Sequence, residues 1–148
     1  MTSSDEAPRI TIEEFEGLLR ATLPVTDVHP CSVISLGWGE AVLRLEFQSW
    51  QLRAGGTLSG PTMFTLADTA LYAATMTRIG FQPLAVTSDL HMRFLRKPEP
   101  RPLVAHARLL RVGRRTAVGT VEIASETEER GVLVPPIVAY ATGTYAIP

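Results

Sequence analysis

Residues 59–77 read SGPTMFTLADTALYAATMT, and this stretch decides the fold. Apolar side chains fall on every side of it at helical spacing, which is typical of a buried helix. Pro61 suits the first turn of such a helix, where its missing N–H costs little, and Ser59 or Gly60 would supply the cap. We therefore expect one long, buried helix in this part of the chain.

Asp68 is the one acidic residue inside that helix. A buried carboxylate costs free energy unless it has hydrogen-bond partners or a function. The sequence allows two interpretations of Asp68. Asp68 is either a structural residue, bonded to Thr65, Tyr72 or a sheet backbone, or a base or nucleophile in a dry cleft.

The start of the helix is a second candidate element. Backbone N–H groups at a helix N-terminus bind anions and can stabilise an oxyanion. Pro61 cannot donate, so the candidate donor is the Gly60 N–H, together with the Ser59 hydroxyl. Asp68 follows Gly60 by eight residues, about 12 Å along a helix. One substrate carbonyl cannot meet both groups of one chain, so joint action of the two groups requires a dimer.

The remaining elements are one helix and a series of strands. Thr11 and Glu14 form a capping-box pattern that opens an amphipathic helix over 12–20. Strands are predicted at 31–36, 40–47, 84–95, 103–112, 115–123 and 132–146, the last interrupted at Pro135 and Pro136. Short turns between strands indicate an antiparallel sheet, with the long helix against one face.

Two strands alternate clearly. Over 40–47 the predicted inner residues are Ala41, Leu43, Leu45 and Phe47, and the outer ones Glu40, Val42, Arg44 and Glu46. Over 84–95 one side carries Leu84, Val86, Leu90, Met92 and Phe94, and the other carries Thr87, Asp89, His91 and Arg93.

Composition limits the class of protein. The chain has 148 residues, 45% of them hydrophobic, a net charge of -1 and a single cysteine, Cys31. We expect a loose lead at 1–10 and a single domain at 11–148, with its core at 30–147. Nothing in the charge predicts a nucleic-acid or membrane partner, and no cysteine or histidine spacing predicts a metal site. The polar N-terminus lacks a signal pattern, so the expected location is cytoplasmic.

Basic residues gather between 93 and 115, where Glu99 is the only acid. Arg93, Arg96 and Lys97 could bind the phosphates of a carrier such as coenzyme A, since guanidinium groups match phosphate oxygens. The competing interpretation is the solvated outer face of a hairpin. The histidines, His29, His91 and His106, fall in no recognised nucleophile motif.

Three blocks together carry a resemblance to a known family: RAGGT at 53–57, SGPTMFTLADTA at 59–70 and VTSDLHMRFLRKP at 86–98. They resemble a hotdog-fold acyl-CoA thioesterase of the phenylacetate-degradation (PaaI-like) type. The resemblance implies an α+β fold, with an antiparallel sheet wrapped around the long helix. It also implies homodimers with two sites at the interface, often paired into homotetramers. The implied reaction is hydrolysis of acyl-CoA to free acid and CoA, with no cofactor apart from the CoA of the substrate.

The resemblance also assigns roles to residues. It implies that Asp68 is the base or nucleophile and that the Gly60 N–H polarises the thioester carbonyl, with Ser59 beside it. Expected substrate contacts are Arg53, Pro61, Thr69 and Tyr72. Three departures stand out: the family's His-Gly-Gly is replaced by residues 59–61, Arg53 stands where relatives have an amide, and Tyr72 replaces a small hydroxyl residue.

Two alternatives stay open. A hotdog hydratase or dehydratase would need a histidine working with the acid, and none lies on this helix. A non-catalytic acyl-CoA-binding or sensor protein is compatible with the missing His-Gly-Gly.

Overall fold

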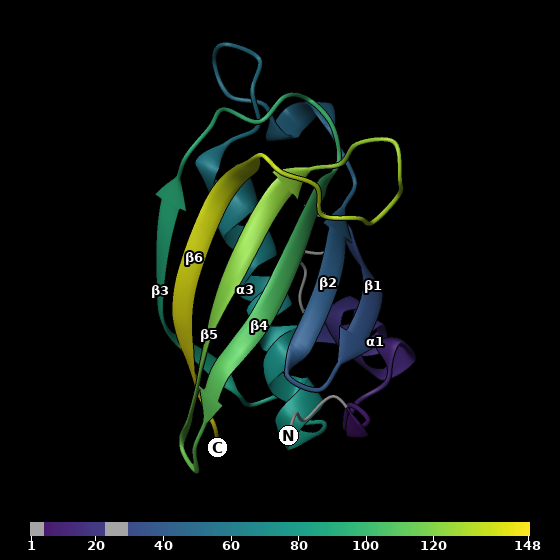
Figure 1. Cartoon of the computed structure of the whole chain (residues 1–148), viewed down its shortest axis with the longest axis vertical. Helices are drawn as coiled ribbons and strands as arrows, with labels where there is room; N and C mark the ends of the chain where they lie inside the picture. Colours follow the sequence, from purple (N-terminus) through teal and green to yellow (C-terminus); the bar gives the residue numbers. More distant parts are fainter. Residues whose placement is uncertain (1–4, 23–29) are drawn as a thin grey trace.

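A six-stranded sheet wraps around one long helix in the computed structural model, which describes residues 5–22 and 30–148 (Figure 1). The elements, in chain order, are α1 (Ile12–Thr22), β1 (Cys31–Gly37), β2 (Glu40–Leu45), the 3-10 turn η2 (Ser49–Gln51), α3 (Gly60–Ile79), β3 (Val86–Phe94), β4 (Leu103–Val112), β5 (Thr116–Ser125) and β6 (Ile137–Ala146). The strand order is β1-β2-β4-β5-β6-β3, and every neighbouring pair is antiparallel. The predicted α+β hotdog arrangement is confirmed.

Helix α3 forms where its sequence predicts it. The Ser59 hydroxyl caps its N-terminus by accepting a hydrogen bond from the Thr62 N–H at 3.3 Å. Pro61 occupies the first turn, and Gly80, at a φ of 87°, ends the helix. Most of the helix, including Thr62 and Met63 of its first turn, is buried against the inner face of the sheet.

Two glycines let α3 approach the sheet closely. Gly119 on β5 and Gly143 on β6 are partners across the two strands. A Cβ atom at either position would lie only 2.8 Å from a methyl carbon of Leu71 on α3. Leu71 therefore packs into a space that exists only because both residues lack a side chain.

The N-terminal helix is also confirmed. The Thr11 N–H donates to the Glu14 carboxylate at 2.9 Å, and the Glu14 N–H donates to the Thr11 hydroxyl at 3.1 Å. Arg9 and Ile10 belong to the predicted loose lead, yet Ile10 is buried and the Arg9 N–H donates to the Thr77 carbonyl at 2.8 Å. The end of the lead therefore packs against the C-terminal turn of α3.

The prediction that Arg44 lies on the solvent side of its strand is wrong. The alternation of β2 puts this residue on the solvent side of the sheet, but its side chain is only 10% exposed. It forms an ion pair at 2.7 Å with Glu126, which follows β5. The segment after β5 folds back over the outer face, because the Gly131 N–H donates to the same carboxylate at 2.7 Å. Strand alternation carries no information about such a covering segment.

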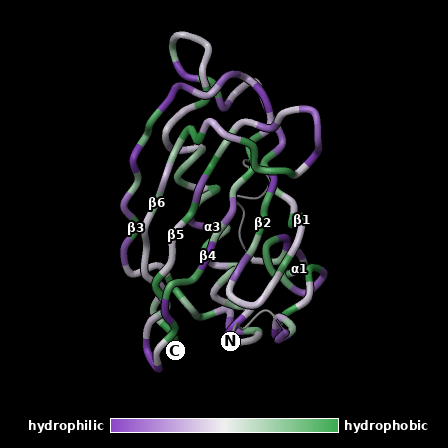
Figure 2. The backbone as a smooth tube through the Cα atoms, viewed as in Figure 1, coloured by the Kyte–Doolittle hydropathy of each residue, from purple (hydrophilic) through white to green (hydrophobic). Residues whose placement is uncertain are grey.

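Strand β3 lies at one edge of the sheet and departs from the alternation of apolar and polar residues predicted for it. A bulge between Thr87 and Asp89 shifts its register against β6. Val86 and Phe94 remain 59% and 52% exposed, although the alternation groups them with the apolar side. Figure 2 shows hydrophilic segments along this edge strand. The strand thus presents apolar side chains and an unpaired backbone edge together.

The last strand begins later than predicted. Residues 132–136 precede β6, which starts at Ile137 and runs to Ala146. Within the described ranges, no helix has the length and hydropathy needed to cross a membrane.

Candidate active site

Asp68 lies beside a cavity of about 370 Å³, here called the Asp68 cavity. Its lining residues are Asp68, Thr69, Tyr72, Pro83, Leu84, Ala85, Val86, Thr87 and Tyr145. They come from the middle of α3, from the segment that enters β3, and from the end of β6. Most of these side chains are apolar or aromatic, and Asp68 contributes the only carboxylate.

Two hydroxyl groups fix one oxygen of Asp68. The Thr87 hydroxyl donates to Oδ1 at 2.6 Å, and the Tyr145 hydroxyl donates to the same atom at 2.8 Å. Tyr145 also lies 3.0 Å from the Asp68 backbone oxygen. Within the described chain, no hydrogen bond reaches Oδ2. The carboxylate is therefore held in one orientation with its second oxygen available.

Tyr145 is suited to its role as donor. Burial, and then the nearby Asp68 charge, raise the pKa of the Tyr145 phenol, so it keeps its proton at neutral pH. The Tyr72 ring stacks on it with centroids 5.5 Å apart. The Tyr72 hydroxyl donates to the Pro83 carbonyl at 2.8 Å, and burial raises its pKa as well.

These partners differ from the ones the sequence suggests. Thr65 and Tyr72 do not bond the Asp68 carboxylate; the Thr65 carbonyl instead accepts from the Thr69 hydroxyl at 2.8 Å. Thr87 and Tyr145 were missed because they are far from Asp68 in sequence. The polar side of the predicted strand at 84–95 contained Thr87, but nothing in the sequence pointed to Tyr145.

Gly60 lies in a second cavity of about 310 Å³, here called the Gly60 cavity. Its lining residues are Arg53, Thr57, Leu58, Gly60, Met63, Phe94, Arg96, Lys97 and Pro98. Within the described part of the chain, no acceptor is bonded to the Gly60 N–H. A Cβ atom at Gly60 would lie 3.3 Å from the Phe94 ring. A side chain at this position would therefore crowd the Phe94 ring, which lines the same cavity.

Ser59 and Pro61 are not among the residues that line the two cavities. The Ser59 hydroxyl lies 2.8 Å from the Thr62 hydroxyl and accepts from the Thr62 N–H, so the helix cap occupies it. Pro61 is exposed and lines neither the Asp68 cavity nor the Gly60 cavity. Arg53, in contrast, is brought to the Gly60 cavity by a turn in which its N–H donates to the Thr57 carbonyl at 2.8 Å.

The Asp68 and Gly60 cavities have no residue in common. Thr69 and Tyr72 line the Asp68 cavity, whereas Arg53 lines the Gly60 cavity. A single chain therefore holds Asp68 and Gly60 in two separate cavities, here called the candidate half-sites, in agreement with the helical distance between the two residues.

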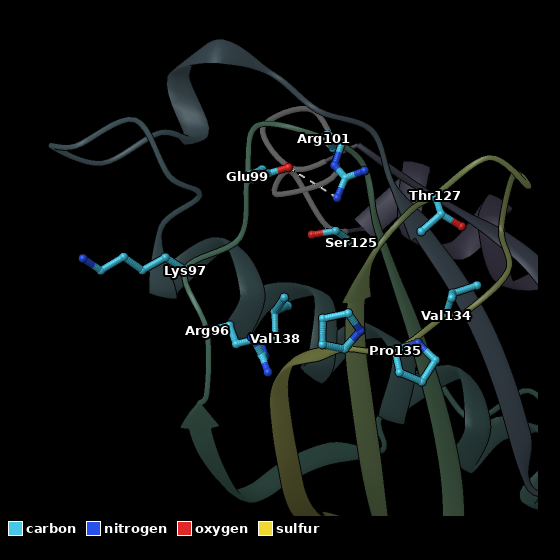
Figure 3. A pocket seen from close by; sticks show the side chains of 10 residues that line it. Arg96, Lys97, Glu99, Arg101, Ser125, Thr127, Val134, Pro135 and Val138 are labelled. Carbon is cyan, nitrogen blue, oxygen red and sulfur yellow. Dashed lines mark ion pairs between the residues drawn. The ribbon is translucent and has the colours of Figure 1, made fainter.

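A third and larger cavity, of about 500 Å³, adjoins the Gly60 cavity through Arg96 and Lys97, which line both. Figure 3 shows its side chains between the β3–β4 connection and the segment before β6. Arg101 forms an ion pair with Glu99 at 3.4 Å, and the Lys97 side chain extends away from the others. Arg93 lines none of these three cavities.

The chain matches a family model, described as the thioesterase superfamily, over residues 55–132. A candidate thioesterase from Silicibacter sp. TM1040 has 37% sequence identity and a TM-score of 0.81, with 99% of this chain and 96% of that one covered. This chain belongs to the thioesterase superfamily.

Other solved structures have the same fold. A variant of the phenylacetic acid degradation protein PaaI from Thermus thermophilus is 30% identical, covering 84% of this chain and 99% of that one, with a TM-score of 0.71. The E. coli PaaI protein, at 22% identity and a TM-score of 0.73, covers 93% and 95% and supports the fold. Curated proteins give no significant match. Membership supports thioester hydrolysis as the general chemistry of this protein.

Proposed function

We propose that this thioesterase-superfamily member hydrolyses acyl-CoA thioesters in a composite site between two subunits. Asp68 of one subunit acts as base or nucleophile, and the Gly60 N–H of the partner subunit stabilises the oxyanion. The observation that carries this proposal is the Asp68 carboxylate, which lines a largely apolar cavity while two hydroxyl groups hold its Oδ1.

The edge strand supplies a geometry for such a dimer. Val86 and Thr87, at the start of β3, line the Asp68 cavity, and Phe94, at its end, lines the Gly60 cavity. If two copies of β3 pair antiparallel about a two-fold axis near Leu90, Val86 of one copy faces Phe94 of the other. Each Asp68 cavity then meets the Gly60 cavity of the other subunit. The exposed apolar side chains at both ends of β3 favour this pairing, which removes them from water.

The chemistry follows from these groups. Acting as a base, Asp68 Oδ2 takes a proton from water while the water oxygen bonds to the thioester carbonyl carbon. The partner's Gly60 N–H donates to the carbonyl oxygen as it gains negative charge. Collapse of the tetrahedral species breaks the C–S bond, and the thiolate takes a proton. If Oδ2 attacks directly, the C–S bond breaks, CoA leaves as a thiolate that takes a proton, and an acyl-aspartate anhydride forms; water then cleaves the anhydride to the free acid and the Asp68 carboxylate.

The acyl group and the CoA would occupy different parts of the site. The largely apolar Asp68 cavity, with Tyr72 and Thr69 on its wall, would hold the acyl group. Arg96 and Lys97, on the rim that the Gly60 cavity shares with the third cavity, would bind CoA phosphates. Arg93 is exposed and lines none of these cavities, so the proposal for the CoA phosphates rests on Arg96 and Lys97.

The described histidines do not favour the hydratase alternative. His91 is exposed on β3, and His106 lies 2.8 Å from Glu40 outside the Asp68 cavity. His29 lies outside the described residues.

The test is a free-thiol assay over a panel of acyl-CoA substrates, with the variant Asp68→Asn. We expect kcat to fall by about 100-fold to 10,000-fold, because the variant loses the base or nucleophile. The matched control is Glu13→Gln, which removes an exposed carboxylate on α1 that lines neither half-site and is not part of the proposed β3 interface. Unchanged turnover in Asp68→Asn would exclude the proposed role. Tight acyl-CoA binding without thiol release by the unmodified protein would instead identify a non-catalytic binding protein.

A further inference from the structure

A cavity of about 360 Å³ lies at the opposite end of α3 from Gly60. Its lining residues are Arg9, Trp38, Arg78, Ile79, Gln82, Val112, Gly113, Arg114 and Ile147; we call it the arginine pocket. Arg78 follows Gly60 by eighteen residues, about 27 Å along a helix. No residue of the arginine pocket lines the Asp68 cavity, the Gly60 cavity or the third cavity.

Two of its arginines are held against one aromatic ring. The guanidinium carbon of Arg78 lies 4.6 Å from the Trp38 ring centroid, and that of Arg9 lies 5.1 Å from it. Arg9 Nη1 also donates to the Arg78 carbonyl oxygen at 3.1 Å. The backbone beside Trp38 is fixed in turn, because the Gly39 N–H donates to the Thr77 hydroxyl at 2.8 Å. These contacts restrain two cations before any ligand arrives.

The third arginine comes from a different part of the chain. Arg114 lies in the β4–β5 turn, which is closed by a 2.8 Å hydrogen bond from the Gly113 N–H to the Thr116 carbonyl. Hydrophilic colour marks this hairpin tip in Figure 2, at the same end of the molecule as the C-terminus. The N-terminal segment, the end of α3 and this hairpin thus each contribute one cation.

The charge of the arginine pocket is uncompensated within the described residues. No aspartate or glutamate lines it, and none of the ion pairs formed in that part of the chain includes Arg9, Arg78 or Arg114. Arginine keeps its charge at any ordinary pH, so the three guanidinium groups repel one another. An anion in the pocket would remove that repulsion.

We propose that the arginine pocket binds the phosphate or diphosphate group of a small molecule. Guanidinium groups match phosphate oxygens with paired, charge-assisted hydrogen bonds, and the Gln82 amide adds a further donor. Ile79, Val112 and Ile147 provide apolar surface for the carbon part of the ligand. This site goes beyond the proposed function, because it lies apart from both half-sites.

The phosphate could come from two sources. It belongs either to the nucleotide part of an acyl-CoA substrate bound to another subunit, or to a separate phosphorylated compound. Both sources present the same group to the three arginines.

Trp38 provides the readout for a binding experiment. The chain has two tryptophans, so Trp50→Phe leaves Trp38 as the only one. In this background, pyrophosphate and 3′,5′-ADP are titrated while Trp38 fluorescence is followed. We expect a saturable change, because an anion drawn between Arg9 and Arg78 alters the contacts of the indole ring.

The variant Arg114→Gln tests the site, and Arg115→Gln is its matched control. Both remove one exposed charge from the same turn, but only Arg114 lines the pocket. We expect Arg114→Gln to weaken pyrophosphate binding about tenfold or more, since it loses a charge-assisted hydrogen bond. Arg115→Gln should bind as the parent does. Asp68→Asn should also bind pyrophosphate normally. The binding test is therefore independent of whether Asp68 has the proposed catalytic role.

Two outcomes would overturn the proposal. One is the absence of a saturable fluorescence change up to millimolar pyrophosphate. The other is an equal loss of affinity in Arg114→Gln and Arg115→Gln, which would indicate diffuse attraction to a basic hairpin.

A kinetic comparison then distinguishes the two sources. If the phosphate belongs to the substrate, Arg114→Gln raises KM for acyl-CoA and leaves KM unchanged for the same acyl group on pantetheine, which has no phosphate. If both KM values stay unchanged while pyrophosphate still binds the parent protein, the ligand is a separate phosphorylated compound.

Discussion

Asp68 presents its two carboxylate oxygens to different surroundings. Oδ1 accepts from Thr87 and Tyr145, whereas Oδ2 accepts no hydrogen bond from the described residues. This arrangement costs little in stability, because the half-buried charge has two donors, and it fixes the direction of the remaining oxygen. Tyr145 and Thr87 therefore act as positioning residues in the proposed mechanism.

The residue-scale prediction concerns Tyr145→Phe. Loss of the phenol hydroxyl removes one hydrogen bond to Oδ1, and we expect kcat for acyl-CoA hydrolysis to fall about tenfold to a hundredfold. KM should change little, because the aromatic ring still fills the same wall of the cavity. Steady-state kinetics on one good substrate measures both values.

Tyr140→Phe is the control for that prediction, since Tyr140 lies on the same strand, β6, at a position that faces the opposite side of the sheet. It should retain the parent's kcat. A rise in KM alone in Tyr145→Phe would assign the hydroxyl to substrate binding, and equal losses in the two variants would indicate a general effect on β6.

At the scale of elements, the Arg44–Glu126 pair links β2 to the segment that follows β5. The Arg44 guanidinium beside Glu126 holds the pKa of that carboxyl below its usual range, and the Gly131 N–H adds to the effect. Glu126 in turn raises the pKa of Arg44. Glu46 also bonds Arg44, at 2.6 Å, but its side chain is 54% exposed. The buried partner is therefore Glu126.

The element-scale prediction is that Glu126→Gln lowers the free energy of unfolding at pH 7 by about 3 kcal/mol. This value is near the lower end for a broken buried ion pair, because Glu46 remains as a partner of Arg44. A folded-state pKa below the unfolded value of about 4.3 gives stability that is complete above that pH and lost as pH falls through the folded pKa. The difference between the parent and the variant should therefore shrink at about pH 3.

Urea denaturation at fixed protein concentration, at both pH values, measures the difference. Glu128→Gln, an exposed change in the same segment, should cost almost nothing at either pH. A gap of the same size at pH 7 and pH 3 would contradict the assignment of the effect to the ion pair.

At the scale of the whole molecule, the two half-sites lie apart in one chain, and the edge strand β3 has one end in each. This arrangement makes subunit complementation a direct test. Gly60→Pro removes the oxyanion donor, and Asp68→Asn removes the acid, so each homodimer should be inactive. A heterodimer of the two variants has one site with both groups intact.

We expect an equal mixture, denatured and refolded together, to regain on the order of a quarter of the parent activity, because half of the random dimers carry one intact site of two. Thiol release measures the recovery, and each variant refolded alone is the control. No recovery from a mixture that contains heterodimers, verified by mass spectrometry with one subunit tagged, would place Asp68 and Gly60 in independent roles.

The local pattern of the sequence was sufficient to predict much of the fold. Helix α3 followed from an apolar run with a Ser-Gly-Pro start, and α1 from its capping box, because both depend on interactions within a few residues. The strands followed from period-two alternation, which failed for Arg44, since a distant segment covers it. The resemblance of three sequence motifs then identified the family, and the match of residues 55–132 to the family model confirms it.

The sequence by itself determined the buried helix, the sheet that wraps it, Asp68 as its single acid and the distance that separates this acid from Gly60. Only the tertiary structure decided which hydroxyls hold Asp68, since Tyr145 is 77 residues away and reaches it through strand pairing. It also decided that Gly119 and Gly143 make room for Leu71, and that three arginines from three elements meet at one pocket. Such contacts depend on the packing of distant segments, which no local periodicity records.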